Sequence, residues 1–179
     1  TAPARTALME EIAARIATDG GAGLFIDYGH AEPGFGDTLQ AVRAHAFDAV
    51  LAHPGEADLT SHVDFAALAA AARANGLATR LSTQSDFLLG LGLLERAGTL
   101  GAQADEAVRE RLRGEVERLA GPDTMGALFK VLAVAPLGVD RMRRRPTALR
   151  SACTVMVCPG SMRTVCSNCL KPGSRTTTG

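Results

Sequence analysis

Four residues with groups suited to chemistry end the first strongly apolar run of the sequence. The run 23–26 leads without a spacer into Asp27, Tyr28, Gly29 and His30. A carboxylate can hold a guanidinium group through two hydrogen bonds, and carboxylate, phenol and imidazole groups can exchange protons during catalysis. The glycine allows a turn or the close approach of a ligand to the backbone. We predict a binding or reaction site here; the alternative is a strand end at which Asp27 only accepts backbone hydrogen bonds.

A second polar segment covers residues 58–65, where His62 and Asp64 precede a helical pattern that begins with Phe65. The backbone N–H groups at the start of a helix favour anions and side-chain acceptors. Asp64 is therefore either the cap of this helix or, together with His62, part of a polar pocket wall that faces Asp27. We favour the cap for Asp64 and leave the role of His62 open.

Imidazole and carboxylate groups are frequent between residues 30 and 62, which raises the question of a metal site. Their spacings match no compact ligand motif, such as two histidines four residues apart on a helix. We therefore expect no metal site among them. The residues considered are His30, Asp37, His45, His53, Asp58 and His62.

Hydrophobic periodicity predicts helices and strands that alternate along the chain. We expect helices over 6–18, 86–96 and 103–119, a further helix that begins at a cap of Ser61 or Asp64 and ends at 75, and strands over 23–27, 77–82 and 128–135. Thr6 is the expected N-cap of the first helix, and Gly20 with Gly21 is its expected stop. Its expected buried stripe is Leu8, Ile12 and Ile16. The segment 86–96 is apolar nearly all round, which predicts burial on every side. Residues 38–43 fit either a strand or a helical turn, and 48–60 an irregular segment.

This order of elements predicts an α/β fold in layers. The first strand lacks an alternating pattern, which favours a strand covered on both faces, as in a parallel sheet. Ligands of such sheets bind beyond the carboxyl ends of the strands. Asp27 to His30 follow a strand directly, so we expect their polar groups at that rim.

The composition bounds the class of protein. The chain has 179 residues, 46% of them hydrophobic, which suits one domain with a core of Leu, Val, Ile and Ala. No window approaches the roughly 18 consecutive apolar residues that a membrane span requires, and Thr1 opens no signal-peptide pattern. We therefore expect a soluble, cytoplasmic protein.

The formal net charge of zero hides two different compositions. Residues 1–140 contain eleven basic and nineteen acidic side chains, whereas residues 141–179 contain eight basic and no acidic ones. The second part includes the basic run 141–145 without interleaved aromatic residues, so we expect no nucleic-acid binding. A disordered tail that arose from a shifted reading frame is our interpretation of this part.

All four cysteines fall in the same tail and could in principle hold zinc. Their spacing, with four, seven and two residues between them, fits the usual zinc motifs poorly. We expect no working zinc site from Cys153, Cys158, Cys166 and Cys169.

Five segments resemble, in this order, the C-terminal half of the MidA-like family of S-adenosylmethionine-dependent methyltransferases. This family includes the mitochondrial arginine methyltransferase that assists assembly of respiratory complex I. The segments are GLFIDYGH (23–30), GDTLQAVRAH (36–45), PGEADLTSHVDFAAL (54–68), STQSDFLLGLGLLERA (82–97) and MGALFKVLAVAP (125–136). The resemblance covers residues 1–136, so we expect two parts: the C-terminal half of a methyltransferase domain, and a tail over 137–179 outside the family.

The resemblance implies a class I methyltransferase fold, a Rossmann-like sheet of seven strands in the order 3-2-1-4-5-7-6 with the seventh antiparallel. On this template residues 24–27, 77–82 and 128–135 resemble the fifth, sixth and seventh strands, which would form a partial sheet in the order 5-7-6 with flanking helices. The family holds its cofactor on a glycine-rich loop after the first strand. The short glycine cluster 34–36 is not followed by a helical pattern and does not fit that role.

By resemblance, the chain takes part in methylation of a protein arginine in complex I assembly with S-adenosylmethionine as cofactor, and we expect this fragment to be inactive alone. Its partner would be a protein substrate or a partner subunit; its oligomeric state stays open. The location would be cytoplasmic in bacteria and mitochondrial in eukaryotic relatives. The rival hypothesis is a non-enzymatic module that docks on a partner. The implied catalytic residues are Asp27, Tyr28 and His62, and the implied substrate pocket contains Gly29, His30 and Asp64.

Overall fold

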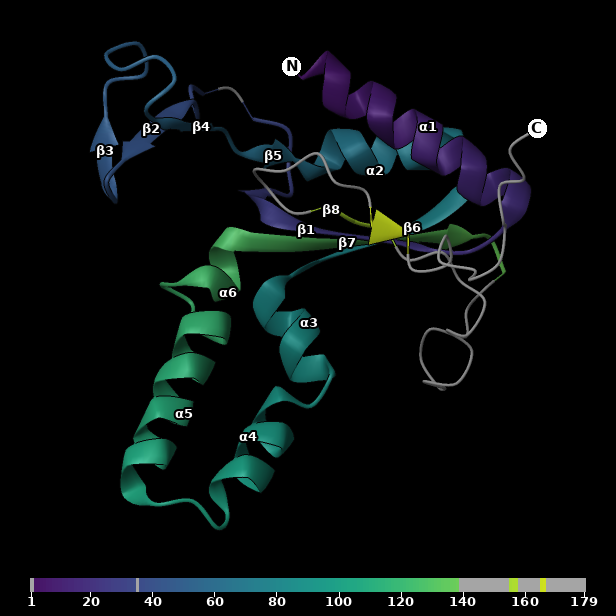
Figure 1. Cartoon of the computed structure of the whole chain (residues 1–179). Helices are drawn as coiled ribbons and strands as arrows, with labels where there is room; N and C mark the ends of the chain where they lie inside the picture. The colour runs from purple at the N-terminus through teal and green to yellow at the C-terminus, as the bar shows by residue number, and fades with distance from the viewer. Residues whose placement is uncertain (1, 35, 139–154, 158–164, 167–179) are drawn as a thin grey trace, which may run out of the picture.

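The computed structural model describes residues 2–34, 36–138, 155–157 and 165–166. A mixed β-sheet separates two groups of helices (Figure 1). Helices α1 (Pro3–Asp19) and α2 (Phe65–Ala74) cover one face of the sheet, and the helices α3 to α6 extend from the other. The structure confirms the predicted α/β fold in layers.

The sheet has the strand order β6-β7-β1-β8-β9, in which β8 is Val155–Val157 and β9 is Val165–Cys166. Strand β5 (Val63–Asp64) also pairs with β1. Strand β7 (Phe129–Pro136) lies between β1 (Gly23–His30) and β6 (Leu77–Thr83) and runs antiparallel to both. These three strands therefore have the order and direction of the fifth, seventh and sixth strands of the methyltransferase template. The predicted partial sheet is confirmed.

Strand β7 is the most deeply buried part of the sheet. Val131, Leu132 and Val134 are each at most 1% exposed. Successive strand residues point to opposite faces, so β7 is covered on both faces, as its nearly unbroken apolar sequence predicts. Ile26 of β1 lies in register with Val131.

The main core lies between the sheet and the helices α1 and α2. It joins residues that lie far apart in the sequence, since β1, α2, β6 and β7 all contribute side chains. Its members include Met9, Ala13, Ile16, Phe25, Phe65, Leu68, Ala72, Leu77, Leu132 and Val134.

Helix α1 begins earlier than predicted. Its first residue is Pro3, its N-cap is Ala2, and no side chain caps it. The predicted cap Thr6 is wrong: the Thr6 hydroxyl lies inside the helix and donates to the carbonyl of Ala2 over 3.5 Å. Proline fits the first turn because its fixed φ is already helical and its missing N–H has no partner there.

The buried side of α1 is also displaced from the predicted stripe. Met9, Ala13 and Ile16 are buried, whereas Leu8 is 45% exposed and Ile12 is partly buried. Only Ile16 of the expected stripe is thus fully in the core. The helix ends as predicted by its glycines, with Gly20 at a φ of 78°.

Strand β1 continues three residues beyond the predicted end at Asp27. The polar residues Asp27 to His30 are therefore part of the strand, and the loop starts only at Ala31. Phe25 is buried, but Leu24 and Ile26 are half-buried, so the expected burial on both faces holds only in part.

Between β1 and α2 the chain forms a three-stranded sheet that projects from the main body (Figure 1). It consists of β2 (Gln40–Arg43), β3 (Ala46–Asp48) and β4 (Asp58–Thr60), and we call residues 37–60 the arm. The open choice over residues 38–43 is thereby settled as a strand. The hairpin β2–β3 was not predicted, because its two-residue turn carries Ala44 and His45 in place of asparagine and glycine.

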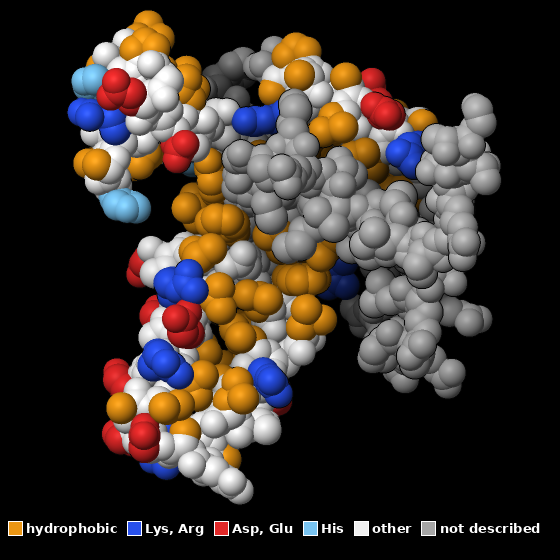
Figure 2. All heavy atoms as spheres, viewed as in Figure 1, with side chains coloured by type: hydrophobic (Ala, Val, Ile, Leu, Met, Phe, Trp, Pro, Cys, Tyr) orange, Lys and Arg blue, Asp and Glu red, His pale blue; other side chains and the backbone are white. Residues whose placement is uncertain are grey.

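The predicted helix over 86–96 is wrong, because the chain breaks there into two helices. Helix α3 (Gln84–Gly90) ends before Gly92, whose φ of 89° is left-handed, and α4 (Leu93–Gly101) follows. The expected burial on all sides is also wrong: Leu91 is 70% and Leu94 57% exposed. Figure 2 shows hydrophobic side chains over this part of the surface.

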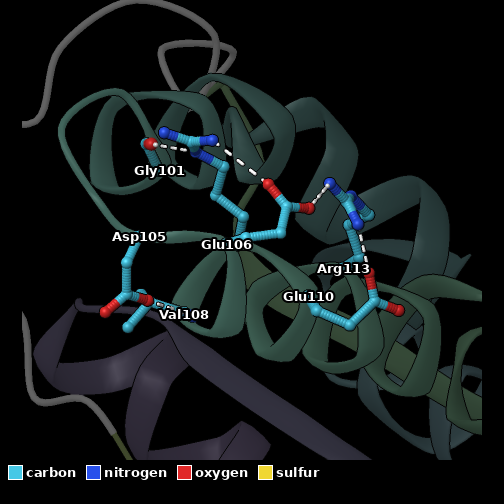
Figure 3. Close-up of polar contacts among 7 residues, drawn as sticks. Gly101, Asp105, Glu106, Val108, Glu110 and Arg113 are labelled. Carbon is cyan, nitrogen blue, oxygen red and sulfur yellow. Dashed lines mark hydrogen bonds and ion pairs between the residues drawn. The ribbon is translucent and has the colours of Figure 1, made fainter.

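Helices α5 (Glu106–Ala120) and α6 (Met125–Leu128) return the chain to β7, and we call residues 84–128 the helical lobe. Asp105 caps α5 by accepting the N–H of Val108 over 2.8 Å, and Glu106 lies between two arginine side chains (Figure 3). These ion pairs are exposed to solvent, which screens them, so they add little to the stability of the helix.

The side chain of Gln84 joins the two ends of the helical lobe. Its Nε2 donates to the carbonyl of Leu119 over 2.8 Å, although Gln84 is only 7% exposed. This bond satisfies a buried polar group and fixes α3 against the end of α5.

Two short strands lie in the tail, β8 (Val155–Val157), parallel to β1, and β9 (Val165–Cys166). The basic run 141–145 and the cysteines 153, 158 and 169 lie outside the described residues, so the zinc and disorder expectations are not tested. No helix in the described part of the chain is long and apolar enough to cross a membrane.

We expect Gly92→Ala to lower the free energy of unfolding by about 1 to 2 kcal/mol, because an L-residue is strained at this left-handed position. Gly114→Ala is the matched control. It lies within α5 with no atom near the added β-carbon, so it should stabilise by about 0.5 to 1 kcal/mol. Urea unfolding measures both, and equal effects of the two substitutions would show that Gly92 does not break the helix.

Candidate functional site

The predicted site residues gather where β1 ends. Asp27, Tyr28, Gly29 and His30 are its last four residues, and His62 directly precedes β5 (Val63–Asp64), which pairs in parallel with the end of β1. The long connection through the arm thus returns to the strand from which it left. The structure brings all six predicted site residues to this one edge of the sheet.

Asp27 is half-buried and faces the side of the sheet that α1 and α2 cover. Its side chain lines a cavity of about 120 Å³ together with Phe25, Arg5, Val63 and other residues of these elements. Burial raises the pKa of Asp27, while the hydrogen bond from the Tyr28 N–H, Arg5 and His62 act in the opposite direction. A carboxylate that has lost part of its hydration gains by the approach of a cation.

Tyr28 belongs to the opposite face of β1, because consecutive strand residues alternate. It pairs in register with Phe129 of β7, and the two rings meet edge to face at 5.7 Å between centroids. The imidazole of His62 meets the Tyr28 ring in the same manner at 5.6 Å. The three rings form an aromatic cluster at the strand end, of a kind that can hold a cation against ring faces.

His62 is the residue near both halves of the site, since it contacts Tyr28 and its charge affects Asp27. Its backbone is held from two sides. Its carbonyl accepts from Arg5 Nη1 over 2.9 Å, and its N–H donates to the Thr38 hydroxyl over 3.3 Å. The position of His62 therefore depends on α1 and on the base of the arm.

Arg5 was not found from the sequence. Its Nη2 also donates to the Ser61 hydroxyl over 2.7 Å, so one guanidinium group fixes the residues before β5 against α1. Nothing in an isolated arginine near a helix start, more than fifty residues from Ser61, indicates this contact. Phe129 was missed as a ring partner for the same reason.

Gly29 permits the close pairing of β1 with β5. A β-carbon at this position would overlap the carbonyl oxygen of Val63 and come within 2.9 Å of its nitrogen. The space beside Gly29 is therefore occupied by the backbone of Val63. The role expected for Gly29 beside a substrate stays a prediction, but its missing side chain already has a structural cause.

His30 and Asp64 pair in register at the end of these strands. Asp64 Oδ1 accepts the N–H of Ala67 over 2.9 Å, which confirms it as the cap of α2. The Nδ1 of His30 lies 2.6 Å from the carbonyl oxygen of Glu32 and donates to it when protonated. Their predicted place in a substrate pocket is not tested by these contacts.

Lys130 lies in register beside Asp27 on β7. Its Nζ donates to the carbonyls of Ala127 and Leu128, at 2.5 and 3.3 Å. Burial lowers the pKa of Lys130. The amine is thus engaged at the end of α6, and no ion pair with Asp27 occurs within the described residues.

Figure 2 shows the molecule hollowed between the arm and the helical lobe, at the left of the view, with hydrophobic side chains at the back. This is the side of the sheet at which β1 ends and β7 begins (Figure 1). In residues 2–34 and 36–138, no group of three or more His, Cys, Asp or Glu side chains could hold a metal ion.

Known proteins resemble this chain over most of its described length. A family described as "Putative S-adenosyl-L-methionine-dependent methyltransferase" matches residues 1–83. The mitochondrial protein arginine methyltransferase NDUFAF7 of Danio rerio is 35% identical over 153 residues, 86% of this chain and 35% of that protein. The Homo sapiens protein of the same name is 35% identical over 130 residues, 72% of this chain and 29% of that protein.

Two solved structures from Burkholderia thailandensis share the fold. One, a methyl transferase candidate bound to S-adenosyl-homocysteine, superposes with a TM-score of 0.61 at 27% identity, over 75% of this chain and 36% of that one. The other, an uncharacterized protein of the same superfamily, gives 0.63 at 26% identity over 73% and 36%. The chain spans about a third of the length of the curated relatives it matches.

We expect Gly29→Ala to lower the free energy of unfolding by about 2 kcal/mol or more, because β5 must move away from β1. The same shift moves His62, so the ring signals of Tyr28 in an NMR spectrum should change. Gly34→Ala, with no atom within 4 Å of the added carbon, is the control and should leave both unchanged. A fully stable Gly29→Ala variant would contradict the close pairing.

The raised pKa of Asp27 predicts a defined pH dependence. The folded state holds this proton to higher pH than the unfolded state, so stability is lost as pH rises from the ordinary value of 3.8 through the raised one. Asp27→Asn should therefore be more stable than the natural chain above this window, with the difference vanishing below it. Urea unfolding across a pH series, with exposed Asp123→Asn as control, measures this; an Asp27→Asn variant less stable at neutral pH would contradict it.

Proposed function

Because the chain belongs to the MidA-like family of S-adenosylmethionine-dependent methyltransferases, we propose that residues 2–136 form the acceptor-side half of a protein arginine methyltransferase. In this proposal they bind and orient the side chain that receives the methyl group. Strand β1 supplies the residues that meet it, and the arm and the helical lobe border its path. The cofactor loop belongs to the other half of the family's sheet.

The arrangement of β7 between β1 and β6 supports this proposal most strongly. An antiparallel strand inserted between two mutually parallel ones matches the template's strand order, and it points the carboxyl ends of β1 and β6 to the same edge. Ligands of open α/β sheets bind at this edge. The side chains found there fit a cationic acceptor.

A guanidinium group fits the chemistry of Asp27 and of the aromatic cluster. The faces of the Tyr28 and Phe129 rings can attract the delocalised cation, and the half-buried Asp27 carboxylate adds negative charge at the strand end. In this proposal Tyr28 and His62 orient the acceptor, and Asp27 favours its charged form. His30, Gly29 and Asp64 border the pocket.

S-adenosylmethionine itself does not fit the cavity beside Asp27. The cavity beside Asp27 holds about 120 Å³, whereas pockets for small molecules of this size class span roughly 300 to 1,000 Å³. Within 2–34 and 36–138 no strand leads through a glycine-rich loop into a helix, and the 34–36 cluster leads to β2. We therefore derive no chemical step from these residues through the cofactor.

Two more specific parts of the proposal do not follow from membership of the family. The first is that the acceptor arginine belongs to a subunit of respiratory complex I. The second is that this chain does not transfer methyl groups by itself. The alternative function, a module that docks on a partner protein without catalysis, is favoured by the exposed leucines of the helical lobe, such as Leu91 and Leu94.

N-acetylarginine methylamide tests the acceptor site directly. We expect it to bind with a dissociation constant in the millimolar range and to shift the NMR signals of Tyr28, His62 and Phe129. Asp27→Asn should weaken binding by about fivefold, because a charge-assisted attraction is lost. The neutral isostere N-acetylcitrulline methylamide is the ligand control, and Asp123→Asn the protein control. Equal binding of both ligands, or shifts confined to other residues, would contradict the proposal.

Titration calorimetry with S-adenosylmethionine tests whether cofactor binding depends on the other half of the family's sheet. Since the cavity beside Asp27 is too small for the cofactor, we expect a dissociation constant weaker than about 100 μM for the 179-residue chain. Micromolar affinity would show that the chain holds the cofactor unaided, and would refute the assignment of the cofactor loop to the other half.

A further inference from the structure

The arm exposes more large apolar surface than a small sheet normally does. Phe47 is 81%, Leu51 84% and Leu59 58% exposed. Strands β2 to β4 form their own sheet and do not pair with the main sheet in the described part of the chain. Isolated small sheets gain stability when one face is covered, and contiguous exposed apolar side chains often mark interaction sites.

One face of the arm is partly covered by its own loop, and Leu59 lies on this face because it pairs with Ala41 across β2 and β4. Ala41 pairs with Asp48 across β2 and β3, and Asp48 accepts from Arg43 Nε over 3.1 Å. The Nδ1 of His53 lies 2.7 Å from the same carboxylate oxygen. Arg43 first, and then His53, hold the pKa of Asp48 below its ordinary value. This cluster folds the β3–β4 connection over Ala41, which is 1% exposed.

The other face of the arm remains open and combines apolar and acidic groups. Val42 pairs with Phe47 on β3 and with Asp58 on β4, so these three side chains share a face. In the strand order β3-β2-β4, each outer strand has one edge that pairs with no other strand among the described residues. An extended peptide can add to such an edge and place alternate side chains on the neighbouring face.

The two residues of the turn at the tip of the arm have left-handed backbone conformations, which are energetically unfavourable for residues other than glycine. Ala44 and His45 have φ angles of 50° and 62°, as in the type I′ turn that matches the twist of a hairpin. Left-handed conformations of residues other than glycine cost free energy and persist where the surroundings enforce them. The free edge of β3 is therefore presented in a fixed, twisted form.

Charge and position indicate what the arm binds. Residues 37–60 contain four acidic side chains and one arginine, which complements a basic segment. The base of the arm is tied to the acceptor site, because the Thr38 hydroxyl accepts the N–H of His62 and Gln40 pairs with Thr60. The base of the arm thus lies beside His62, whose ring contacts Tyr28.

We infer that the arm is a docking subsite for an extended, basic segment of the protein substrate that flanks the acceptor arginine. The segment adds to the free edge of β3 and packs alternate apolar side chains against Val42 and Phe47, while its basic side chains lie near Asp58. This inference rests on the proposed function and adds to it the class of sequence around the arginine.

Two probes of different length separate docking on the arm from binding at the acceptor site. The long probe is a peptide of about twelve residues with one arginine and a flank of alternating valine and lysine, enough for a strand of about five residues. The short probe is N-acetylarginine methylamide. Fluorescence anisotropy of the labelled long peptide and NMR titration of the short probe give the two affinities for the full chain.

Phe47→Ser should weaken binding of the long peptide by about fivefold or more, as truncation of an interface anchor does, and leave the short probe unchanged. Asp58→Asn should weaken the long peptide less and reduce its dependence on salt. Leu137→Ser, which removes a comparably exposed side chain just beyond β7, at the opposite edge of the sheet, is the matched control and should leave both affinities unchanged. Circular dichroism confirms that each variant is folded.

The outcomes separate this inference from the proposed function. Normal binding of the long peptide to Phe47→Ser, or an equal loss in Leu137→Ser, overturns docking on the arm while the acceptor site stands. Loss of self-association instead of peptide binding in Phe47→Ser assigns the face to a second copy and also overturns it. If neither probe binds the natural chain, the proposed function fails and the inference fails with it.

Discussion

The pairing of β7 with β1 on one side and β6 on the other is the constraint on which the rest of the structure depends. The three strands pair over most of their length, and β7 contributes three of the four largest fully buried side chains within the described residues, Leu132 at 0% and Val131 and Val134 at 1% exposure each. Because β7 is antiparallel, the connection from β6 must return to the edge at which β1 also ends. The helical lobe makes this connection, so it borders the candidate site.

The pairing of β1 with β7 also determines on which face of the sheet each site residue lies. Register with β7 places Asp27 beside Lys130 and Tyr28 beside Phe129, and alternation then directs Asp27 and Tyr28 to opposite faces. The charged group lies in a partly dry cavity under α1, whereas the ring joins an aromatic cluster. His62 lies near both because Gly29 lets β5 approach, and because Arg5 holds the backbone before β5. Substrate recognition would therefore depend on contacts between elements far apart in sequence.

The apolar runs at 23–26 and 131–135 predict two strands of the main sheet, whereas the order of the strands follows from the resemblance to the family. The sequence also predicts the stop at Gly20 and the cap at Asp64, which depend on neighbouring residues only. The sequence does not predict the helix break at Gly92, because the leucine-rich pattern of 86–96 outweighs its two glycines. Nor does it predict Arg5 or the Tyr28–Phe129 contact, which depend on strand register. Local signals therefore define elements, whereas the site depends on pairing between them.

Residue-resolved amide hydrogen exchange on the natural chain tests the central claim most directly. Amides that open only with the whole fold exchange slowest, so the account predicts the strongest protection at Val131–Val134 and at the facing residues 24–26, with the arm much faster. Protection of this kind requires β7 to be hydrogen-bonded on both sides. Exchange of Val131–Val134 as fast as that of residues 40–60 would contradict the order β6-β7-β1, and with it the assignment of the strand end after Ile26 to a reaction pocket.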